Sequence, residues 1–281
     1  MMRELLSGIL YPLTRVVERV SPGIRILMYH RVYPMESYDQ LVVHPDRFAA
    51  QMQWLNEHAR VISLEEAVEE LSTGVRKPGV VVTFDDGYRD NLEYALPVLT
   101  RLAIPATIFI TTQFCDGTLV HPRYRDERER VHLNWAEVKE MEKHPEIAIG
   151  SHTCSHPHLQ RLDDGTARRE IAESRRQISS RIGKPVSLFC YPSGDYGERE
   201  LEYVRDAGYR AAVTVSPGRN RETTDPYALR RTEISDKDSI AQLQKKLDGA
   251  YDPIHQILDH RRRRRFAQLA RHATENREAR S

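Results

Sequence analysis

Seven short apolar runs recur along the chain, and stretches with helical spacing of apolar residues separate them. The runs cover residues 24–32, 80–86, 106–112, 147–153, 186–192, 211–216 and 228–234. Several are almost uninterrupted, as at Val80, Val81 and Val82, which is typical of strands covered on both faces. Strands that alternate with helices predict an α/β fold with a mostly parallel sheet, either closed into a barrel or open.

The segments between the runs carry helix signals. Phe48, Met52 and Leu55 are spaced helically within residues 45–57, and Ser63-Leu64-Glu65-Glu66 predicts a capping box for a helix that ends at Gly74. Further helices are expected over residues 91–102, 135–143, 166–182 and 198–207. One connection, over residues 113–134, is long and without periodicity, which is typical of a lid or of disordered surface.

Residues 1–22 place leucine, isoleucine and valine at three- and four-residue steps, which predicts an amphipathic helix. Such a helix packs on the domain or lies on a membrane surface, and the sequence leaves both open. Charged residues at Glu4, Arg15, Glu18 and Arg19 interrupt the apolar positions, so neither a bilayer-spanning run nor a clear secretory signal is expected. The compartment, cytoplasmic or at the periphery of a membrane, stays open.

The C-terminal residues 251–281 contain an unbroken arginine run from Arg261 to Arg265, in a chain whose formal net charge is only +1. Apolar residues flank the run at roughly helical spacing, which predicts a basic helical tail. Such a helix suits an anionic membrane surface or an acidic glycan, or it stays solvated. Nucleic acid is not an expected partner, because no aromatic residues alternate with the arginines.

Chemically reactive side chains follow three of the predicted strands. His30 lies in the first run, Asp85 and Asp86 end the second, and His152 and His156 end the fourth. Because the carboxyl ends of parallel strands share one edge of a sheet, we expect these groups to lie together. A spacing of four can bring two imidazoles together on one turn. With one carboxylate they complete a three-ligand metal site that leaves positions open for water and substrate.

The cysteines indicate no competing metal site. Cys115, Cys154 and Cys190 contain no CxxC pair, so neither a cysteine-based zinc site nor a disulfide framework is expected. With 40% hydrophobic and 30% charged residues, the composition is that of an ordinary globular protein.

Three segments resemble the motifs of a known family. The first is Thr83-Phe84-Asp85-Asp86-Gly87, the second is Ser151-His152-Thr153-Cys154-Ser155-His156, and the third is Phe189-Cys190-Tyr191-Pro192-Ser193-Gly194. They are similar to the three motifs of the NodB-type polysaccharide deacetylases, carbohydrate esterase family 4. The opening Ile26-Leu27-Met28-Tyr29-His30-Arg31-Val32 resembles the branch related to poly-N-acetylglucosamine deacetylases. The resemblance implies a NodB-like deacetylase domain over residues 23–250, folded as a distorted (β/α)7 barrel of mostly parallel strands with surrounding helices.

The resemblance also implies a role for each residue. Asp86, His152 and His156 would hold one divalent metal ion, usually zinc in this family. Asp85 would be the general base, and His30 the general acid that protonates the leaving sugar nitrogen. The implied reaction is the metal-dependent hydrolysis of an N-linked acetyl group from an N-acetylated sugar or polysaccharide.

The chain departs from the third motif at two positions. The family often has an arginine where Cys190 stands and an aromatic residue where Ser193 stands. Because that arginine supports the base, we expect Arg231, on the seventh strand, to take its place. Arg230 and Arg231 point to opposite sides of the strand, so only one of them faces inward. A backbone N–H near Ser193 is expected to stabilise the oxyanion, and Tyr191 is predicted to supply the missing aromatic platform.

Two other functions are considered. Two histidines and a carboxylate also form the facial triad of iron(II) oxygenases, but those enzymes are antiparallel, β-rich and carry a His-x-Asp/Glu element. A catalytically degenerate, carbohydrate-binding relative is the second alternative, and the departures at Cys190 and Ser193 motivate it. The sequence determines neither the sugar nor the oligomeric state.

Overall fold

The structure is a computed structural model that describes residues 23–35, 37–75, 77–126 and 130–278, together with Tyr11 and Thr14. Side chains are described as far as Arg271. The amphipathic helix expected over residues 1–22 therefore lies outside the described residues, except at those two positions.

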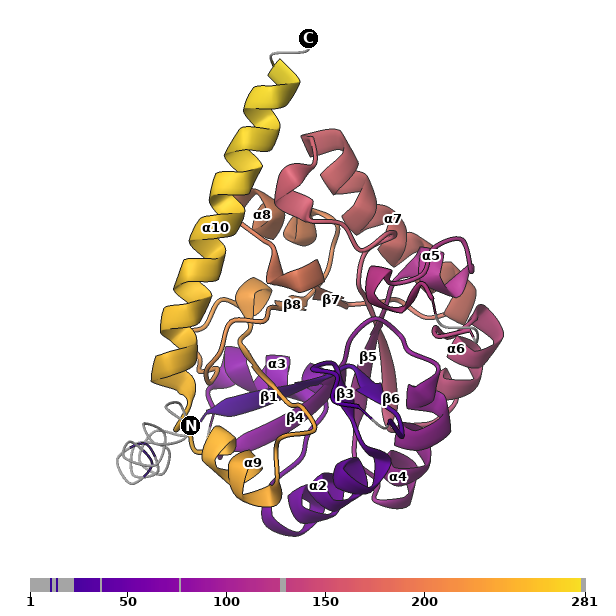
Figure 1. Ribbon diagram of the computed structural model, residues 1–281, viewed down its shortest axis with the longest axis vertical. Helices are drawn as coiled ribbons and strands as arrows, with labels where there is room; N and C mark the ends of the chain where they lie inside the picture. The colour runs from indigo at the N-terminus through magenta and orange to yellow at the C-terminus, as the bar shows by residue number, and fades with distance from the viewer. Residues whose placement is uncertain are drawn as a thin grey trace.

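Within the described residues, seven parallel strands form one curved sheet. They are β1 (Ile24–Tyr29), β4 (Gly79–Phe84), β5 (Ala106–Ile110), β6 (Ile147–Ser151), β7 (Leu188–Cys190), β8 (Ala211–Val213) and β9 (Arg231–Glu233), in the order β8-β7-β6-β5-β4-β1-β9. The two ends of the sheet meet where the Leu229 N–H donates to the Ala212 carbonyl (2.9 Å) and the Thr214 N–H donates to the Leu229 carbonyl (2.8 Å). The predicted distorted (β/α)7 barrel is confirmed (Figure 1).

The first predicted strand proves to be two strands. β1 stops before His30, and β2 (Arg31–Val32) pairs with β3 (Val42–Val43) in a separate two-stranded sheet. Asp90 stabilises this change of direction by accepting hydrogen bonds from Nε of Arg31 (2.7 Å) and from the next backbone N–H (3.0 Å). His30 is therefore left at the rim of the barrel, between two strands.

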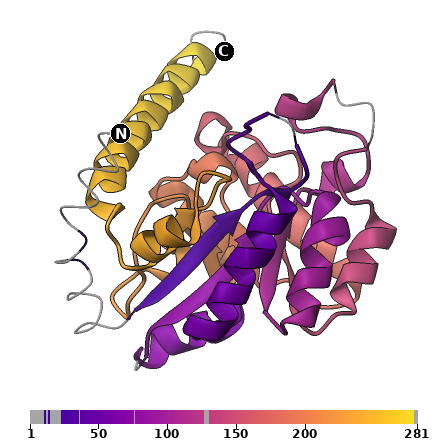
Figure 2. The same cartoon turned by 60° about the horizontal axis from the view of Figure 1, so that its bottom comes forward.

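Helices cover the outer face of the barrel (Figures 1 and 2). They are α2 (Pro45–His58), α3 (Leu64–Thr73), α4 (Leu96–Arg101), α5 (Thr112–Cys115), α6 (Trp135–Glu142), α7 (Asp164–Ile182), α8 (Glu198–Asp206), α9 (Ile240–Leu247) and α10 (Asp252–Glu278). Ser63 caps α3 by accepting a hydrogen bond from the Glu66 N–H (3.0 Å). The helix expected over residues 91–102 is a π-helical turn (Asn91–Ala95) followed by α4, and the long connection contains α5 and a 3-10 turn (Pro122–Tyr124).

Alternate residues of the strands enter two different apolar clusters. Ile26 of β1 and Phe109 of β5 belong to a cluster that also contains the buried side chains of α3, whereas their neighbours Leu27 and Ile108 belong to a second cluster with the buried side chains of α2, α4, α6, α7, α8 and α9. This alternation follows from the two-residue repeat of a strand. It explains the continuous apolar runs of the sequence, because both faces of each strand are covered.

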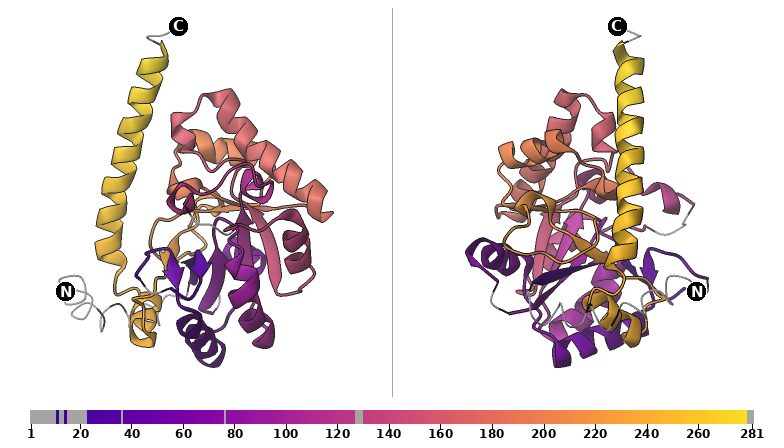
Figure 3. Two further views of the ribbon diagram at one scale, coloured as in Figure 1. Left: turned by 45° about the vertical axis from the view of Figure 1, so that its right-hand side comes forward. Right: turned by 90° about the vertical axis from the view of Figure 1, so that its left-hand side faces the viewer.

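The C-terminal helix α10 runs beside the barrel, and its C-terminal end extends past it (Figures 1 and 3). It contacts the 3-10 turn Leu159–Arg161, which follows β6. None of the helices within the described ranges combines the length and the apolar character needed to cross a bilayer.

Candidate active site

β4 delivers two carboxylates to the rim of the barrel. Asp85 and Asp86 follow its last residue, and each is 3% exposed. Asp86 adopts the left-handed conformation (φ 68°), which costs a non-glycine residue roughly 1–2 kcal/mol. The next residue, Gly87, is also left-handed (φ 61°), and a Cβ there would meet Cγ2 of Ile110 at 2.8 Å. Such stored strain is typical of functional sites.

The two expected imidazole ligands follow β6, and an irregular loop brings them together in place of a helical turn. Thr153 and His156 have positive φ angles of 69° and 57°. The carboxylate of Glu170 on α7 accepts hydrogen bonds from the backbone N–H groups of residues 154 and 155, both at 2.9 Å. As a result, the ring centroids of His152 and His156 lie 4.7 Å apart. The sequence spacing predicted the proximity but not the conformation.

Asp86, His152 and His156 together fit a metal ion. Oδ1 of Asp86 lies 3.4 Å from Nε2 of His152 and 3.3 Å from Nε2 of His156, and the three ligand atoms lie within 4.8 Å of one another. Two atoms bound tetrahedrally to zinc at about 2.0–2.1 Å lie about 3.4 Å apart. Among the described residues, Oδ1 of Asp86 is buried and has no hydrogen-bond partner. The distances and the unpartnered oxygen both suit a cation between the three groups.

The orientation of His152 also suits metal binding. Nδ1 of His152 lies 2.8 Å from the carbonyl oxygen of Cys190. In the tautomer whose Nδ1–H donates to that carbonyl, Nε2 is free to bind a metal. Burial opposes ionisation of Asp86, but the nearby imidazoles of His156 and His152 hold its pKa well below the usual value, so the carboxylate is in its charged form.

The second carboxylate, Asp85, is paired with a buried arginine from β9. Arg231 is 1% exposed, and its two Nη atoms donate to the two carboxylate oxygens of Asp85, both at 2.7 Å. Nη2 of Arg231 also lies 3.1 Å from Sγ of Cys190, whose small side chain leaves room for the guanidinium. Burial opposes ionisation of Asp85, but the charge and hydrogen bonds of Arg231 outweigh it and hold the pKa of Asp85 below its usual value. Asp85, His152 and Cys190 form a second group whose ligand atoms are close enough to hold a metal ion. The guanidinium of Arg231 already supplies a positive charge to this group, so it has less need of a cation.

His30 lies next to Asp85 at the mouth of the barrel. Its Nε2 is 4.0 Å from Oδ2 of Asp85, and its side chain is 14% exposed, so solvent and substrate can reach it. The side-chain amide of Asn91 donates to the His30 carbonyl at 2.9 Å, which holds the backbone of this residue. An imidazole in this place can give a proton to a group bound beside Asp85.

Ser193 and Tyr191 differ in their access to the site. Ser193 is exposed, has a φ of 55° and lines the groove, and none of the described residues accepts a hydrogen bond from its N–H. Tyr191 is 0% exposed, donates its hydroxyl to the Tyr227 carbonyl (3.1 Å) and stacks on Tyr196 with ring centroids 4.9 Å apart. The prediction that Tyr191 offers an aromatic platform to the substrate is therefore wrong, because its ring is part of the core.

The site residues border one groove of about 490 Å³. Besides the predicted residues, the lining contains Met28, Gln40, Leu41, His121, Arg123, Val215, Pro217, Glu233, His255, Leu258, Asp259 and Arg262. None of the described lining residues is phenylalanine, tyrosine or tryptophan. The long connection over residues 113–134, for which a lid was one expectation, contributes His121 and Arg123 to the lining, whereas the contribution of α10 was not predicted. Residues 255, 258, 259 and 262 are spaced so that they share one face of a helix, and this spacing could have predicted the contribution of α10.

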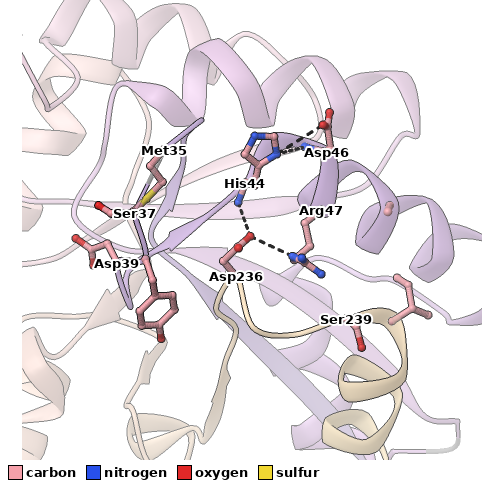
Figure 4. A pocket seen from close by; sticks show the side chains of 11 residues that line it. Met35, Ser37, Asp39, His44, Asp46, Arg47, Asp236 and Ser239 are labelled. Atoms are coloured by element: carbon pink, nitrogen blue, oxygen red, sulfur yellow. Dashed lines mark hydrogen bonds and ion pairs between the residues drawn. The ribbon is translucent and has the colours of Figure 1, made fainter.

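A separate pocket of about 560 Å³ is lined by residues around the start of α2 and by Asp236 (Figure 4). Its charged groups are already paired, because Oδ1 of Asp236 accepts hydrogen bonds from the His44 N–H (3.0 Å) and from Nε of Arg47 (3.1 Å). None of the predicted catalytic or metal-binding residues lines this pocket. The groove at the barrel mouth is therefore the candidate active site.

Comparison with known sequences identifies relatives that are named as deacetylases. Residues 73–212 match the sequence model of the polysaccharide deacetylase family. YxkH of Bacillus subtilis (strain 168), a protein classed with the polysaccharide deacetylases, is 32% identical over 213 residues, which are 75% of this chain and 71% of that protein. The poly-beta-1,6-N-acetyl-D-glucosamine N-deacetylase of Staphylococcus aureus (strain MSSA476) is 24% identical over 213 residues, 75% of this chain and 73% of that protein.

Solved structures agree with this relationship. The Streptococcus pyogenes deacetylase PplD in complex with acetate superposes with a TM-score of 0.72 at 25% identity, covering 81% of this chain and 99% of that one. IcaB from Ammonifex degensii shares the fold, with a TM-score of 0.68 at 23% identity over 81% of this chain and 98% of that one. The barrel, the motifs at its rim and these relatives lead to one conclusion: the chain belongs to the polysaccharide deacetylase family of hydrolases.

Proposed function

We propose that this protein is a metal-dependent N-deacetylase that hydrolyses the acetamide of an N-acetylated sugar in a glycan. The observation that supports the proposal most is the cluster of Asp86, His152 and His156 beside the Asp85–Arg231 pair. The substrate class rests on the relatives, since one is named a poly-beta-1,6-N-acetyl-D-glucosamine N-deacetylase and another was solved with acetate.

Three groups of the chain would act on the substrate. Asp85 accepts a proton from the attacking water, and Arg231 keeps its carboxylate charged and oriented for that step. The N–H of Ser193 donates to the carbonyl oxygen of the acetyl group as negative charge develops there. His30 donates a proton to the sugar nitrogen, because an amine leaves poorly as an anion.

The low pKa of Asp85 makes this carboxylate a weak base by itself, so the water must be acidified by another group. A divalent metal ion held by Asp86, His152 and His156 supplies that chemistry when bound, since it lowers the pKa of a coordinated water and polarises the acetyl carbonyl. One carboxylate and two imidazoles form a donor set that zinc commonly takes, so we propose zinc.

Release of acetate from oligomers of N-acetylglucosamine tests the proposal. The purified protein with zinc is expected to release acetate, a chelator to abolish the release, and added zinc to restore it. A His156→Ala variant is expected to bind zinc more weakly, since one of three ligands is missing. If the protein binds zinc but releases no acetate from any N-acetylated oligomer, the alternative of a degenerate, carbohydrate-binding relative is correct.

The role of His30 as the acid predicts a difference between two leaving groups. A His30→Ala variant is expected to deacetylate the sugar amide about 100-fold more slowly, the lower range for a lost general acid. Hydrolysis of an aryl acetate should change far less, because a phenolate leaves without being protonated. Parallel kcat measurements on the two substrates check this, and equal losses on both would assign His30 a structural role instead.

We also propose that the basic outer face of α10 contacts anionic membranes. Arg261, Arg264 and Arg265 are exposed on this helix, and Ile257 beside them is 60% exposed. A basic helix with exposed apolar side chains binds anionic lipid through charge and through insertion of the apolar groups.

Flotation with phosphatidylcholine vesicles, with and without phosphatidylglycerol, measures this contact. Each basic residue contributes about 1 kcal/mol near an anionic surface, so an Arg261→Gln, Arg264→Gln, Arg265→Gln variant should bind roughly 100-fold more weakly. Binding should also weaken with salt. Equal binding of the wild type to both kinds of vesicle would exclude an electrostatic contact.

A further inference from the structure

The helix α10 presents two different faces. One face lines the groove that contains Asp85 and the metal cluster. It consists of residues 255, 258, 259 and 262, which follow one another at steps of three, one and three. Their neighbours at 257 and 261 do not line the groove. This division follows from the helical repeat, which places residues three and four apart on the same side. α10 lies outside residues 73–212, which match the family sequence model.

Aromatic contacts hold the inner face of α10 against the barrel. Phe266 packs edge-on against His158 with ring centroids 5.2 Å apart, and the guanidinium of Arg263 lies 4.7 Å from the ring centre of Tyr196. His158 and Tyr196 belong to the loops that follow β6 and β7, which also carry His156 and Ser193. The position of α10 is therefore coupled to the loops that form the site.

Arg262 is the half-buried member of the arginine run, whereas Arg261, Arg263, Arg264 and Arg265 are exposed. One of its Nη atoms pairs with Oδ1 of Asp259, and its Nε is buried without a hydrogen-bond partner among the described residues. The pair is nearly neutral as a whole, so its remaining donors and acceptors suit sugar hydroxyls better than a second charge. Leu258 adds an apolar surface, 36% exposed, in a groove whose described lining has no Phe, Tyr or Trp side chain.

We propose that α10 forms one wall of the substrate groove and that Leu258, Asp259 and Arg262 bind a sugar adjacent to the one that is deacetylated. The enzyme therefore selects a glycan chain over a single N-acetylated sugar. This inference rests on the proposed deacetylase function and extends it to the recognition of the chain.

Neighbouring residues of α10 provide matched controls. Arg262→Ala is expected to raise KM for an N-acetylglucosamine pentamer about tenfold or more, as expected for lost hydrogen bonds to a charged group. Arg261→Ala should leave it unchanged. Leu258→Ser and Ile257→Ser form a second pair. Leu258→Ser should raise KM for the pentamer, whereas Ile257→Ser should leave it unchanged. Arg262→Lys, which keeps the charge but not the planar donor geometry, should recover only part of the loss.

Three measurements separate a binding role from a structural one. For Arg262→Ala, kcat for the pentamer, kcat/KM for an aryl acetate and the thermal midpoint are all expected to match the wild type. An equal loss on the pentamer and on the aryl acetate would overturn the inference, because the substitution would then disturb the site itself. An unchanged KM for the pentamer would overturn the inference alone, whereas a wild type that deacetylates no N-acetylated oligomer would overturn the proposed function as well.

Discussion

An Asp85→Asn variant is expected to release acetate at least about 100-fold more slowly than the wild type, the range found for loss of a general base. The amide has almost the shape of the carboxylate but cannot accept a proton from water at neutral pH. Because the proposed metal ligands are Asp86, His152 and His156, the zinc content of this variant should stay at the wild-type value.

The adjacent Asp86→Asn variant is the matched control. It should also lose activity, but through weaker zinc binding, which elemental analysis of the dialysed protein measures. Both assays belong at a temperature where circular dichroism shows each variant to be folded, because Asp85→Asn leaves the Arg231 charge without its partner. A rate within a few-fold of the wild type for Asp85→Asn would show that Asp85 is not the base, whereas loss of zinc from this variant would show that Asp85 helps to hold the metal.

An Arg231→Met variant is expected to lose about 3–5 kcal/mol of stability, the usual cost of removing one partner of a buried ion pair. Arg231 is 1% exposed and Asp85 is 3% exposed, so neither charge can be hydrated when the other is removed. Denaturation with urea measures the loss. Arg230→Met is the control, since that neighbouring side chain is exposed and its removal should change stability by less than about 0.5 kcal/mol.

The same pair predicts how stability depends on pH. Because the pKa of Asp85 in the folded protein lies below its usual value, the pair stabilises the fold above the usual aspartate pKa of about 4. This contribution is lost as the pH falls through the lower, folded-state pKa. The difference in unfolding free energy between wild type and Arg231→Met should therefore be largest near neutral pH and decrease in acid. A difference that is independent of pH would mean that the two groups are not coupled.

Much of the fold could be predicted because strands and helices leave local patterns. Runs such as Val80–Val82 are continuous since both faces of β4 are buried, and the helix start at Ser63 follows from one local hydrogen bond. The break in the first strand could not be predicted in this way. It depends on Asp90, which comes 59 residues after Arg31 along the chain and binds its side chain.

The sequence by itself determined which candidate site residues are grouped together. Asp85 and Asp86 directly follow a buried strand, and His152 and His156 directly follow another. The parallel order of the sheet places such residues at one rim. These relationships are local, or follow from the general geometry of parallel sheets, so a pattern along the chain was sufficient to predict them.

Only the tertiary structure decided which long-range contacts complete the site. The guanidinium of Arg231 reaches Asp85 past the intervening strand β1 and lies beside the small side chain of Cys190, whereas the ring of Tyr191 packs into the core and not into the groove. The wall formed by α10 also depends on contacts between segments about a hundred residues apart, such as Phe266 with His158. A sequence shows which side chains are available, but their partners depend on how the whole barrel packs.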